Sequence, residues 1–479
     1  MRAPGLILAA PASGSGKTLL TLGLLRYLRN RGLRVAAAKA GPDYIDPGFH
    51  AAAGGGPCVN LDPWAMRPAT LAGLVGASER HPLWCDHLPS PPRKRGSRGD
   101  RPSLALDSRW RGNDDTLCSH TAEIVLCEGV MGLFDGTGPD GEQGSTAALA
   151  RLTGWPVVLV VDARRQGASA AALVGGFARH DPAVRLAGII FNRVAGARHR
   201  ALLEAAMARH LPDIPCLGAV PDDPALMLPE RHLGLVPARE SGAAAEAVIV
   251  RAAEAIGEAL DVDRLVALAR PASLTGEKTA PLPPLGAHIA VAHDDAFLFS
   301  YPAILHGWRR QGAELSFFSP LGDEAPNPAA DAVFLPGGYP ELHAGRLAAC
   351  GGFIAGLRRA AGLGATIYGE CGGYMALGES LTDADGRAHR MAGLLPLETS
   401  FAARRLHLGY RQATLMQAGP LGPAGAHFRG HEFHYAATVA AEGEPLFALS
   451  DACGDDLGPS GLRRGTVMGS FIHLIDQAD

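Results

Sequence analysis

A turn of small residues near the start of the chain has the composition of a phosphate-binding loop. The stretch SGSGKT follows the apolar run GLILAA and leads into TLLTLGLLRYLRNRG, which carries the apolar stripe of a helix. A strand, such a turn and Gly-Lys-Thr at a helix start direct backbone amides at phosphate, with Lys17 on the terminal phosphates and the Thr18 hydroxyl on Mg²⁺. The standard pattern has glycine where Pro11 stands, and because proline donates no amide, that end of the loop must be shaped differently. We expect nucleotide binding by Gly14, Ser15, Gly16, Lys17 and Thr18, and reading of the adenine edge by Asn192, which ends the run LAGIIFN.

Three carboxylates follow apolar runs that are typical of strands. Asp43 and Asp46 lie in KAGPDYIDPGFH, which also holds Lys39, one of four lysines in the chain, and Glu128 lies at the end of EIVLCEG. Each of these carboxylates, taken alone, is equally typical of a helix cap or a solvated loop residue. In an open parallel sheet, however, ligands bind where the strands end, and Mg²⁺ prefers oxygen ligands. We expect these three carboxylates to handle substrate carboxylates or metal, with Thr18, Asp46 and Glu128 as the metal ligands.

A cysteine and a histidine late in the chain have the setting of a thiol nucleophile and its base. The run ATIYGE leads straight into Cys371, and two glycines and the helical pattern MALGESL follow, so the thiol lies at a sharp strand-to-helix turn. The amides and dipole at a helix start favour a thiolate. His473, in the apolar run GSFIHLID, is the expected base. Alone, each residue is more often a buried core group. The combination predicts nucleophilic catalysis by Cys371 and His473, with an oxyanion hole formed by Gly337, Gly338 and Gly372.

Short apolar runs that alternate with helical patterns must position these residues. In the first half of the chain the runs are 5–11, 34–40, 123–129, 156–163, 186–192 and 215–221, and after a Pro-, Thr- and Gly-rich stretch they resume at 288–294, 314–320, 331–338 and 365–371. Continuous apolar strands that alternate with helices imply a parallel sheet covered on both faces. The expected fold is α/β with two domains, 1–268 and 288–479, joined by a linker over 269–287.

Composition narrows the class of protein. The 479 residues are 47% hydrophobic with a formal charge of −4, which predicts two or three domains and gives no electrostatic case for nucleic acid. No apolar run approaches the ~18–20 residues of a membrane-spanning helix. The eight cysteines form no C-x-x-C pair, which argues against a disulfide framework or a zinc ribbon. We therefore expect a cytoplasmic protein without nucleic-acid or membrane partners. The basic segment 89–115 is interpreted as a disordered surface insertion rather than a nucleic-acid patch.

Several runs together closely resemble the cobyrinic acid and hydrogenobyrinic acid a,c-diamide synthases of the cobalamin pathway. They are KAGPDYIDPGFH, EGVMGLFDG, GSTAALA, LPERHLGLVPARE, PGGYPELH, GECGGYMALG and GHEFH, and the resemblance covers nearly the whole chain except 82–120. It implies a P-loop domain, similar to dethiobiotin synthetase, that phosphorylates acetate carboxylates of a corrin ring with ATP and Mg²⁺. It also implies a C-terminal flavodoxin-like class I glutamine amidotransferase domain with Cys371 as nucleophile and His473 as base. The implied substrates are a corrinoid tetrapyrrole acid and glutamine; the oligomeric state is not indicated.

Four points stay open at this stage. Amidotransferases of this class often carry His-x-Glu, but His473 is followed by Leu-Ile, so either Asp476 or Glu370 replaces the acid or a dyad suffices. In GHEFHY, His431 and His434 fall on opposite faces of a strand, which favours a contact with a corrin carboxylate or a structural role over zinc. The same motifs suit another tetrapyrrole acid, such as nickel-sirohydrochlorin. An alternative from another class is a P-loop partitioning ATPase with a non-catalytic second domain.

Overall fold

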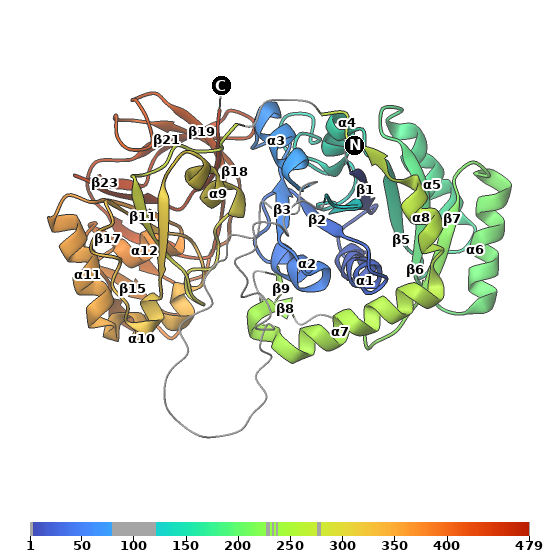
Figure 1. The fold of residues 1–479 in the computed structure, drawn as a ribbon, viewed down its shortest axis with the longest axis horizontal. Helices are drawn as coiled ribbons and strands as arrows, with labels where there is room; N and C mark the ends of the chain where they lie inside the picture. The colour runs from blue at the N-terminus through green and yellow to red at the C-terminus, as the bar shows by residue number, and fades with distance from the viewer. Residues whose placement is uncertain are drawn as a thin grey trace, which may run out of the picture. The chain divides into compact units, whose positions relative to one another are not determined.

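The described chain forms two compact units. The computed structural model describes residues 3–78, 121–226, 230–231, 234–235, 238–274 and 279–478. The first unit draws its described residues from 1–64, 71–87 and 95–278, and the second from 65–70, 88–94 and 279–479 (Figure 1). The expected insertion 89–115 lies outside the described residues. The predicted boundaries of the two domains and the linker stay a prediction.

The first unit is built on a sheet whose main strands are all parallel, in the order β3-β2-β4-β1-β5-β6-β7. A short strand, β10 (Arg270–Pro271), pairs antiparallel with β1. The predicted parallel sheet is confirmed, and its central strands are buried, as expected of strands covered on both faces. One strand, CVNL, was not predicted. The strands are β1 (Pro4–Ala9), β2 (Val35–Ala40), β3 (Cys58–Leu61), β4 (Ile124–Glu128), β5 (Val157–Asp162), β6 (Leu186–Val194) and β7 (Cys216–Pro221).

Helices α1, α2 and α7 of this unit pack against one another, as do α5 and α6. Arg26 on α1 links the first three: its Nε donates to the Ala53 carbonyl oxygen (3.2 Å) on α2, and its Nη2 to Glu246 Oε2 (3.0 Å) on α7. The helices are α1 (Lys17–Asn30), α2 (Asp46–Gly54), α3 (Pro68–Ser78), α4 (Thr146–Thr153), α5 (Ser169–His180), α6 (Ala197–His210), α7 (Ala238–Ala259) and α8 (Val262–Leu268), and β8 (Glu230–Arg231) pairs with β9 (Gly234–Leu235). No helix within the described residues is both long and apolar enough to span a membrane.

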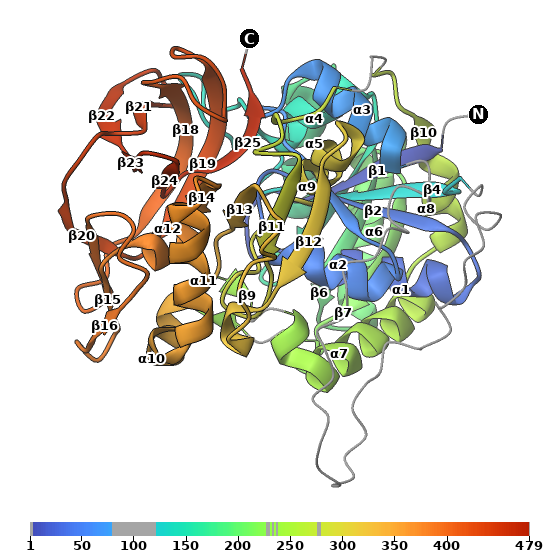
Figure 2. The same cartoon turned by 60° about the vertical axis from the view of Figure 1, so that its left-hand side comes forward.

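The second unit has a central sheet in the order β12-β11-β13-β14-β24-β23. The first five strands are parallel, and their order is the 2-1-3-4-5 of flavodoxin-like folds, which confirms the predicted class. A single residue, Cys371, separates the end of β14 from the start of α12, and the two elements are seen in Figure 2. The elements are β11 (His288–Ala292), α9 (Pro302–Arg310), β12 (Glu314–Phe318), η3 (Pro320–Gly322), β13 (Ala332–Leu335), η4 (Pro340–His343), α10 (Ala344–Ala349), α11 (Gly351–Gly362), β14 (Thr366–Glu370), α12 (Gly372–Leu377), β23 (Leu462–Arg464) and β24 (Val467–Ser470).

Two further sheets of the second unit were not predicted. One has the order β16-β15-β17-β20 and the other β22-β21-β18-β19-β25. Many side chains on their strands are only half buried, so the strands lack the continuous apolar runs that revealed the central sheet. The last strand, β25, begins with His473. The strands are β15 (Ser380–Thr382), β16 (Ala388–Arg390), β17 (Leu397–Ser400), β18 (His407–Leu415), β19 (His427–His434), β20 (Ala437–Ala441), β21 (Phe447–Asp451), β22 (Asp456–Ser460) and β25 (His473–Gln477).

Candidate functional sites

The loop between β1 and α1 has the backbone expected of a phosphate-binding loop. Gly14 and Gly16 adopt φ of 76° and 88°, the left-handed region that glycine enters without strain. A Cβ at Gly16 would lie 2.3 Å from Asn192 Nδ2, so only glycine leaves room for this side chain. The Asn192 amide donates to the Ser15 carbonyl oxygen (2.9 Å), and the Ser15 hydroxyl donates to Ala12 (2.8 Å). Asn192 therefore holds the loop, while its predicted contact with adenine stays a prediction.

The structure explains how the loop tolerates proline in place of the usual glycine. The Leu133 N–H donates to the Ala10 carbonyl oxygen (2.8 Å), which ties the segment after β4 to the residue before Pro11. A Cβ at Gly132 would lie 2.7 Å from the Pro11 carbonyl oxygen. Pro11 is thus packed against the neighbouring segment through its carbonyl side.

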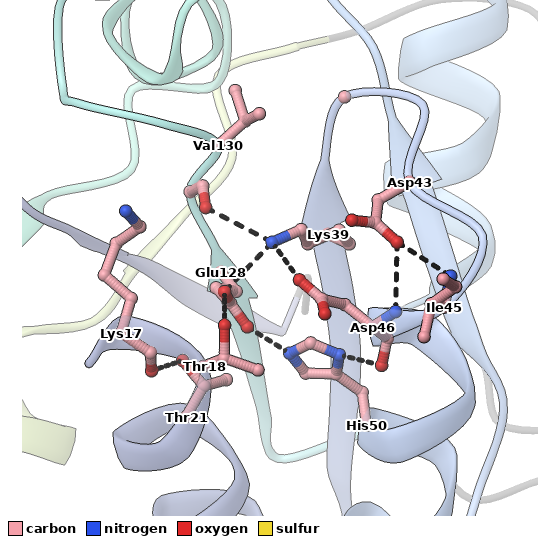
Figure 3. Close-up of polar contacts among 12 residues, drawn as sticks. Lys17, Thr18, Thr21, Lys39, Asp43, Ile45, Asp46, His50, Glu128 and Val130 are labelled. Atoms are coloured by element: carbon pink, nitrogen blue, oxygen red, sulfur yellow. Dashed lines mark hydrogen bonds and ion pairs between the residues drawn. The ribbon is translucent and has the colours of Figure 1, made fainter. Parts of the chain in front are cut away.

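Four polar side chains meet at the carboxyl ends of β2 and β4 (Figure 3). Lys39 and Glu128 are register partners on these neighbouring strands. Glu128 Oε1 accepts from the Thr18 hydroxyl (2.7 Å) and from Lys39 Nζ (2.9 Å). Lys39 Nζ also pairs with Asp46 Oδ2 (2.7 Å), so the ammonium lies between the two carboxylates. Parallel pairing therefore brings together residues that are far apart in the sequence.

The sequence analysis missed one member of this cluster, His50 on α2. Its Nε2 lies 2.7 Å from Glu128 Oε2, and its Nδ1 lies 2.6 Å from the Asp46 carbonyl oxygen, with the ring fully buried. The signal that could have found it is its spacing. His50 follows Asp46 by four residues on a helix that starts at Asp46, which places both side chains on one face.

Burial and neighbouring charges set the protonation of the cluster. Burial alone would raise the pKa of Glu128, but Lys39 and His50 outweigh it and hold this pKa well below its usual range. Burial and the neighbouring Asp43 raise the pKa of Asp46 to about 6. Burial lowers the pKa of Lys17 to about 8, and its ammonium donates to the Met131 carbonyl oxygen. Glu128 is thus ionised at neutral pH.

Asp43 is engaged differently from the other two carboxylates. Its Oδ1 accepts from the backbone amides of Ile45 (2.7 Å) and Asp46 (3.0 Å), so it caps the start of α2, as the simpler interpretation of a loop carboxylate allowed. It still lines the same cavity, of about 540 Å³, as the other expected residues. Of the predicted residues, the lining includes Gly14, Gly16, Lys17, Thr18, Asp43, Asp46, Glu128 and Asn192, together with Lys39; Ser15 contributes its carbonyl to Asn192 instead.

The donor set at this cavity suits a hard divalent cation. Thr18, Asp46 and Glu128 offer one hydroxyl and two carboxylates, which are the oxygen ligands that Mg²⁺ prefers. Asp46 and Glu128 both form ion pairs with the Lys39 ammonium in this cluster. The two carboxylates are therefore placed where they stabilise a positive charge between them. The predicted metal ligands fit Mg²⁺ on this ground.

The second site begins at the turn between β14 and α12, in the second unit. Cys371 has φ 47° and ψ −103°, a conformation that costs a non-glycine residue free energy and that is typical of a nucleophile held on a sharp turn. Its N–H donates to the Ser470 carbonyl oxygen (2.8 Å), which ties the turn to β24. The cysteine is 3% exposed. The predicted elbow is therefore present in the backbone.

The glycines predicted to form an oxyanion hole gather around the same turn. A Cβ at Gly337 would lie 2.3 Å from His473 Cε1, so the PGG segment runs directly against the imidazole. A Cβ at Gly372 would lie 3.0 Å from the Gly338 backbone nitrogen. The ends of β13 and β14 and the start of β25 thus bring Gly337, Gly338, Gly372 and His473 together.

The two acids left open as partners of His473 have different surroundings. Glu370 Oε2 lies 3.8 Å from His473 Nδ1, and its Oε1 accepts from the Leu474 N–H (3.1 Å). Asp476 instead accepts from the Arg67 N–H (2.8 Å) and from Arg67 Nη2 (2.7 Å). Only Glu370 of these two acids lies beside the imidazole.

Burial keeps the thiol and the imidazole neutral. Burial, with Glu341 adding to it, raises the pKa of Cys371 well above its ordinary value. Burial and the neighbouring His431 and His434 lower the pKa of His473 well below its ordinary value. Burial also raises the pKa of Glu370 to about 8, partly offset by the Leu474 amide. The resting pair is thus a thiol and a neutral imidazole.

The histidines of GHEFHY border this site. The ring of His431 lies 5.1 Å from that of His473, whereas His434 stacks on Phe471 at 4.0 Å, in line with opposite faces of a strand. His434 Nε2 lies 2.9 Å from Glu432 Oε1. His407, Glu432 and His434 also have ligand atoms within 4.8 Å of one another, a grouping that the sequence analysis did not consider. Arg411 Nε lies 2.8 Å from Glu432 Oε2, so this carboxylate is already paired with a cation.

Comparisons with known proteins agree with both sites. Residues 6–236 match the CobQ/CobB/MinD/ParA nucleotide binding domain, and residues 288–479 match the CobB/CobQ-like glutamine amidotransferase domain. The chain is 51% identical over 475 residues to a hydrogenobyrinate a,c-diamide synthase of Brucella anthropi, covering 98% of each chain. It is 49% identical to the protein of that name from Rhizobium meliloti, covering 98% of this chain and 99% of the relative.

Solved structures resemble only parts of the chain. PurLQS from Thermotoga maritima covers 40% of this chain and 88% of its own, with a TM-score of 0.29 and 17% identity. The septum site-determining protein MinD from Pyrococcus horikoshii covers 55% of this chain and 98% of its own, with a TM-score of 0.27 and 14% identity.

Proposed function

The chain belongs to the family of the hydrogenobyrinate a,c-diamide synthases, and we propose that it converts the a and c acetate carboxylates of hydrogenobyrinate into carboxamides, using ATP and glutamine. The observation that carries this proposal is the 49–51% identity to such enzymes over 98% of the chain. Eight relatives with this name match at 48–51% identity, and each is covered over nearly its whole length. Hydrogenobyrinate is therefore preferred over cobyrinate and nickel-sirohydrochlorin as the substrate.

The first half-reaction activates the carboxylate. Hydroxide is too poor a leaving group for direct amination, so a substrate carboxylate oxygen attacks the γ-phosphorus of ATP, ADP leaves, and a mixed anhydride forms. Lys17 and Lys39 lie at the cavity where they stabilise the charge of the transferred phosphoryl group. Mg²⁺, held by Thr18, Asp46 and Glu128, supplies further neutralisation of phosphate charge when it is bound.

The second half-reaction supplies ammonia. The thiol proton of Cys371 passes to His473, and the sulfur attacks the side-chain carboxamide carbon of glutamine. His473 returns the proton to the leaving nitrogen, so ammonia departs and a thioester remains, which water hydrolyses to glutamate. The amides around Gly337, Gly338 and Gly372 would stabilise the oxyanion of each tetrahedral intermediate.

Ammonia joins the two half-reactions. It attacks the carbonyl carbon of the mixed anhydride, phosphate leaves, and the carboxamide forms. Ammonium in bulk water at neutral pH carries no free electron pair, so we infer that ammonia passes to the anhydride without mixing with solvent.

We also propose that the protein is cytoplasmic, where ATP and glutamine are available.

The decisive experiment is mass spectrometry of tetrapyrrole acids incubated with the protein, Mg-ATP and glutamine. Hydrogenobyrinate, cobyrinate and nickel-sirohydrochlorin acids are tested in parallel. We expect two carboxylate-to-carboxamide conversions on hydrogenobyrinate. Conversion of another acid alone would move the proposal to that substrate, and ATP hydrolysis that no tetrapyrrole stimulates would favour the partitioning ATPase instead.

The variant Cys371→Ser separates the two half-reactions. It should abolish amidation with glutamine, because the serine hydroxyl is a far weaker nucleophile than the thiol, and it should retain amidation with ammonium chloride. Product formation with each nitrogen source is the measurement. Loss of both activities in a variant that folds like the wild type would contradict the division of labour between Cys371 and the P-loop site.

A further inference from the structure

We infer that Glu370, the residue directly before the nucleophile, is the positioning residue that orients His473 and stabilises its protonated form during glutamine hydrolysis. The inference rests on the proposed glutaminase reaction and deepens it, because the chain lacks the acid two residues after the histidine. In the proposed step the Cys371 thiol proton moves to one ring nitrogen of His473. The Glu370 carboxylate accepts a hydrogen bond from the other ring nitrogen, so no further proton is transferred.

The geometry around Glu370 places its two oxygens in different roles. Oε1 accepts from the N–H of Leu474, the residue directly after His473, at 3.1 Å, which holds the carboxyl against the backbone of β25. Oε2 then lies 3.8 Å from His473 Nδ1. Glu370 and His473 are 3% and 1% exposed, so water does not screen an interaction between them. One carboxyl group thus contacts both the main chain and the side chain at the start of β25.

The neighbouring elements explain why this carboxyl takes the role. Glu370 ends β14, and its register partner Ser470 ends β24, with two residues between Ser470 and the start of β25. The same turn that holds the Cys371 thiol therefore carries the acid beside the base. Asp476 lies three residues along β25 from His473, and both of its oxygens accept from Arg67. Asp476 is thus committed elsewhere.

Charge near the imidazole supports the same assignment. Burial favours neutral His473, so imidazolium forms readily only beside an anion. Among the described residues, those that act electrostatically on His473 from β19 are His431 and His434, which both oppose its protonation. Glu370 is the adjacent acid, and although burial raises its pKa to about 8, its ionised fraction supplies the group of opposite sign. The groups that act on Cys371 are Glu341 from η4, Glu432 from β19 and Glu370 from β14, and Tyr368 and Leu474 act on Glu370.

The test compares the full-length variants Glu370→Gln, Glu370→Asp and Asp476→Asn with the wild type. Glu370→Gln keeps an acceptor for the Leu474 amide and removes the charge, whereas Glu370→Asp keeps the charge. Asp476→Asn removes the charge of the other candidate acid. Alkylation of Cys371 by iodoacetamide is followed against pH, because only the thiolate reacts. Glutaminase kcat and KM, and hydrogenobyrinate amidation with ammonium chloride, are measured on the same preparations.

We expect Glu370→Gln to raise the midpoint of alkylation, because the imidazolium that stabilises the thiolate loses the opposite charge of Glu370, and this loss outweighs the removal of the direct repulsion between Glu370 and the thiolate. Glutaminase kcat should fall while the KM for glutamine stays near that of the wild type. Glu370→Asp should restore part of the shift, Asp476→Asn should leave the midpoint unchanged, and ammonia-driven amidation should be unaffected in Glu370→Gln. An unchanged midpoint in Glu370→Gln, or a shift that appears in Asp476→Asn instead, would overturn the inference.

The two proposals fail separately. If the wild-type protein hydrolyses glutamine but amidates no tetrapyrrole, the proposed function is wrong and the alkylation profile still tests Glu370. If hydrogenobyrinate is amidated normally and the alkylation midpoint of Glu370→Gln equals that of the wild type, the proposed function stands and the positioning role of Glu370 is wrong.

Discussion

Lys39 is the residue whose surroundings say most about the synthetase site. Its ammonium is 4% exposed and lies between Asp46 and Glu128 at distances of 2.7 and 2.9 Å. Burial would lower the pKa of Lys39, but the two carboxylates outweigh it and raise this pKa well above its ordinary value. The Lys39 ammonium therefore stays charged beside Asp46 and Glu128 and balances the negative charge of these predicted metal ligands. We expect it also to stabilise the charge of the transferred phosphoryl group.

We predict that Lys39→Met slows carboxylate activation by at least ~10²-fold, the usual cost of removing one preorganised charge donor from a transition state. ADP release with hydrogenobyrinate and ammonium chloride measures this rate. Glutaminase activity serves as the control, because Cys371 and His473 lie in the other unit. Lys39→Arg keeps the charge and tests whether loss of the buried cation has merely unfolded the first unit. An ADP release rate in Lys39→Met equal to that of the wild type would contradict the assigned role.

Among the elements, the last strand is held at both ends. β25 begins with His473, against Gly337, and carries Asp476, whose side chain is fully buried and accepts from Arg67. Arg67 lies in residues 65–70, a short segment of the first half of the chain that belongs to the second unit. Its Nη2 also donates to the Ala280 carbonyl oxygen (3.1 Å). Among the described residues, the second unit therefore depends on two separate parts of the sequence, 65–70 and 279–478.

We predict that Arg67→Met destabilises the second unit by about 3–5 kcal/mol, because Asp476 is left buried without its cation. Arg200→Met is the matched control. Its partner Glu204 and Arg200 itself are half exposed, so its loss should cost about 0–1 kcal/mol. Urea unfolding is followed by glutaminase activity for Arg67→Met and, because Arg200 lies in the first unit, by ADP release for Arg200→Met, each against the wild type. Equal shifts of the midpoint in the two variants would show that the buried pair contributes nothing beyond a surface ion pair.

For the whole molecule, the buried titratable groups of the second unit make its stability depend on pH. Burial raises the pKa of Glu370 to about 8 and that of Glu341 to about 7, from an ordinary value of 4.5. The folded unit then binds more protons than the unfolded chain between pH 4.5 and about 7–8, so these groups lower the stability as pH rises through that whole range. Burial lowers the pKa of His431 to about 3 from 6.5, and that of His473 also falls, so these groups lower the stability as pH falls below 6.5.

We therefore predict that the second unit is most stable between about pH 4.5 and 6.5, where the two effects oppose each other, and less stable on either side. The measurement is the urea midpoint at each pH, read from glutaminase activity after dilution into one assay buffer. Glu341→Gln should reduce the loss of stability between pH 6.5 and 8, because it removes one carboxyl that must ionise while buried. A midpoint that rises steadily from pH 5 to 9 would contradict the assignment of raised carboxyl pKa values.

Local patterns in the sequence were enough to predict much of both sites. The phosphate-binding loop, the strand that ends at Glu128, the strand that carries Asn192, and the elbow at Cys371 each arise from residues within a few positions of one another. Turn glycines and continuous apolar strands act over that short range, so a single stretch predicts them. The strand CVNL and the sheets that hold β18 and β19 escaped prediction, because short or half-buried strands leave no continuous apolar run.

The sequence by itself determined which chemical groups are present and on which kind of turn each one lies. Only the tertiary structure decided which groups meet: that His50 contacts Glu128, that Lys39 lies between two carboxylates, and that Glu370 rather than Asp476 lies beside the base. The physical reason is strand pairing. The register of β2 with β4 and of β14 with β24 places residues side by side that are about a hundred positions apart, and no local pattern records that register.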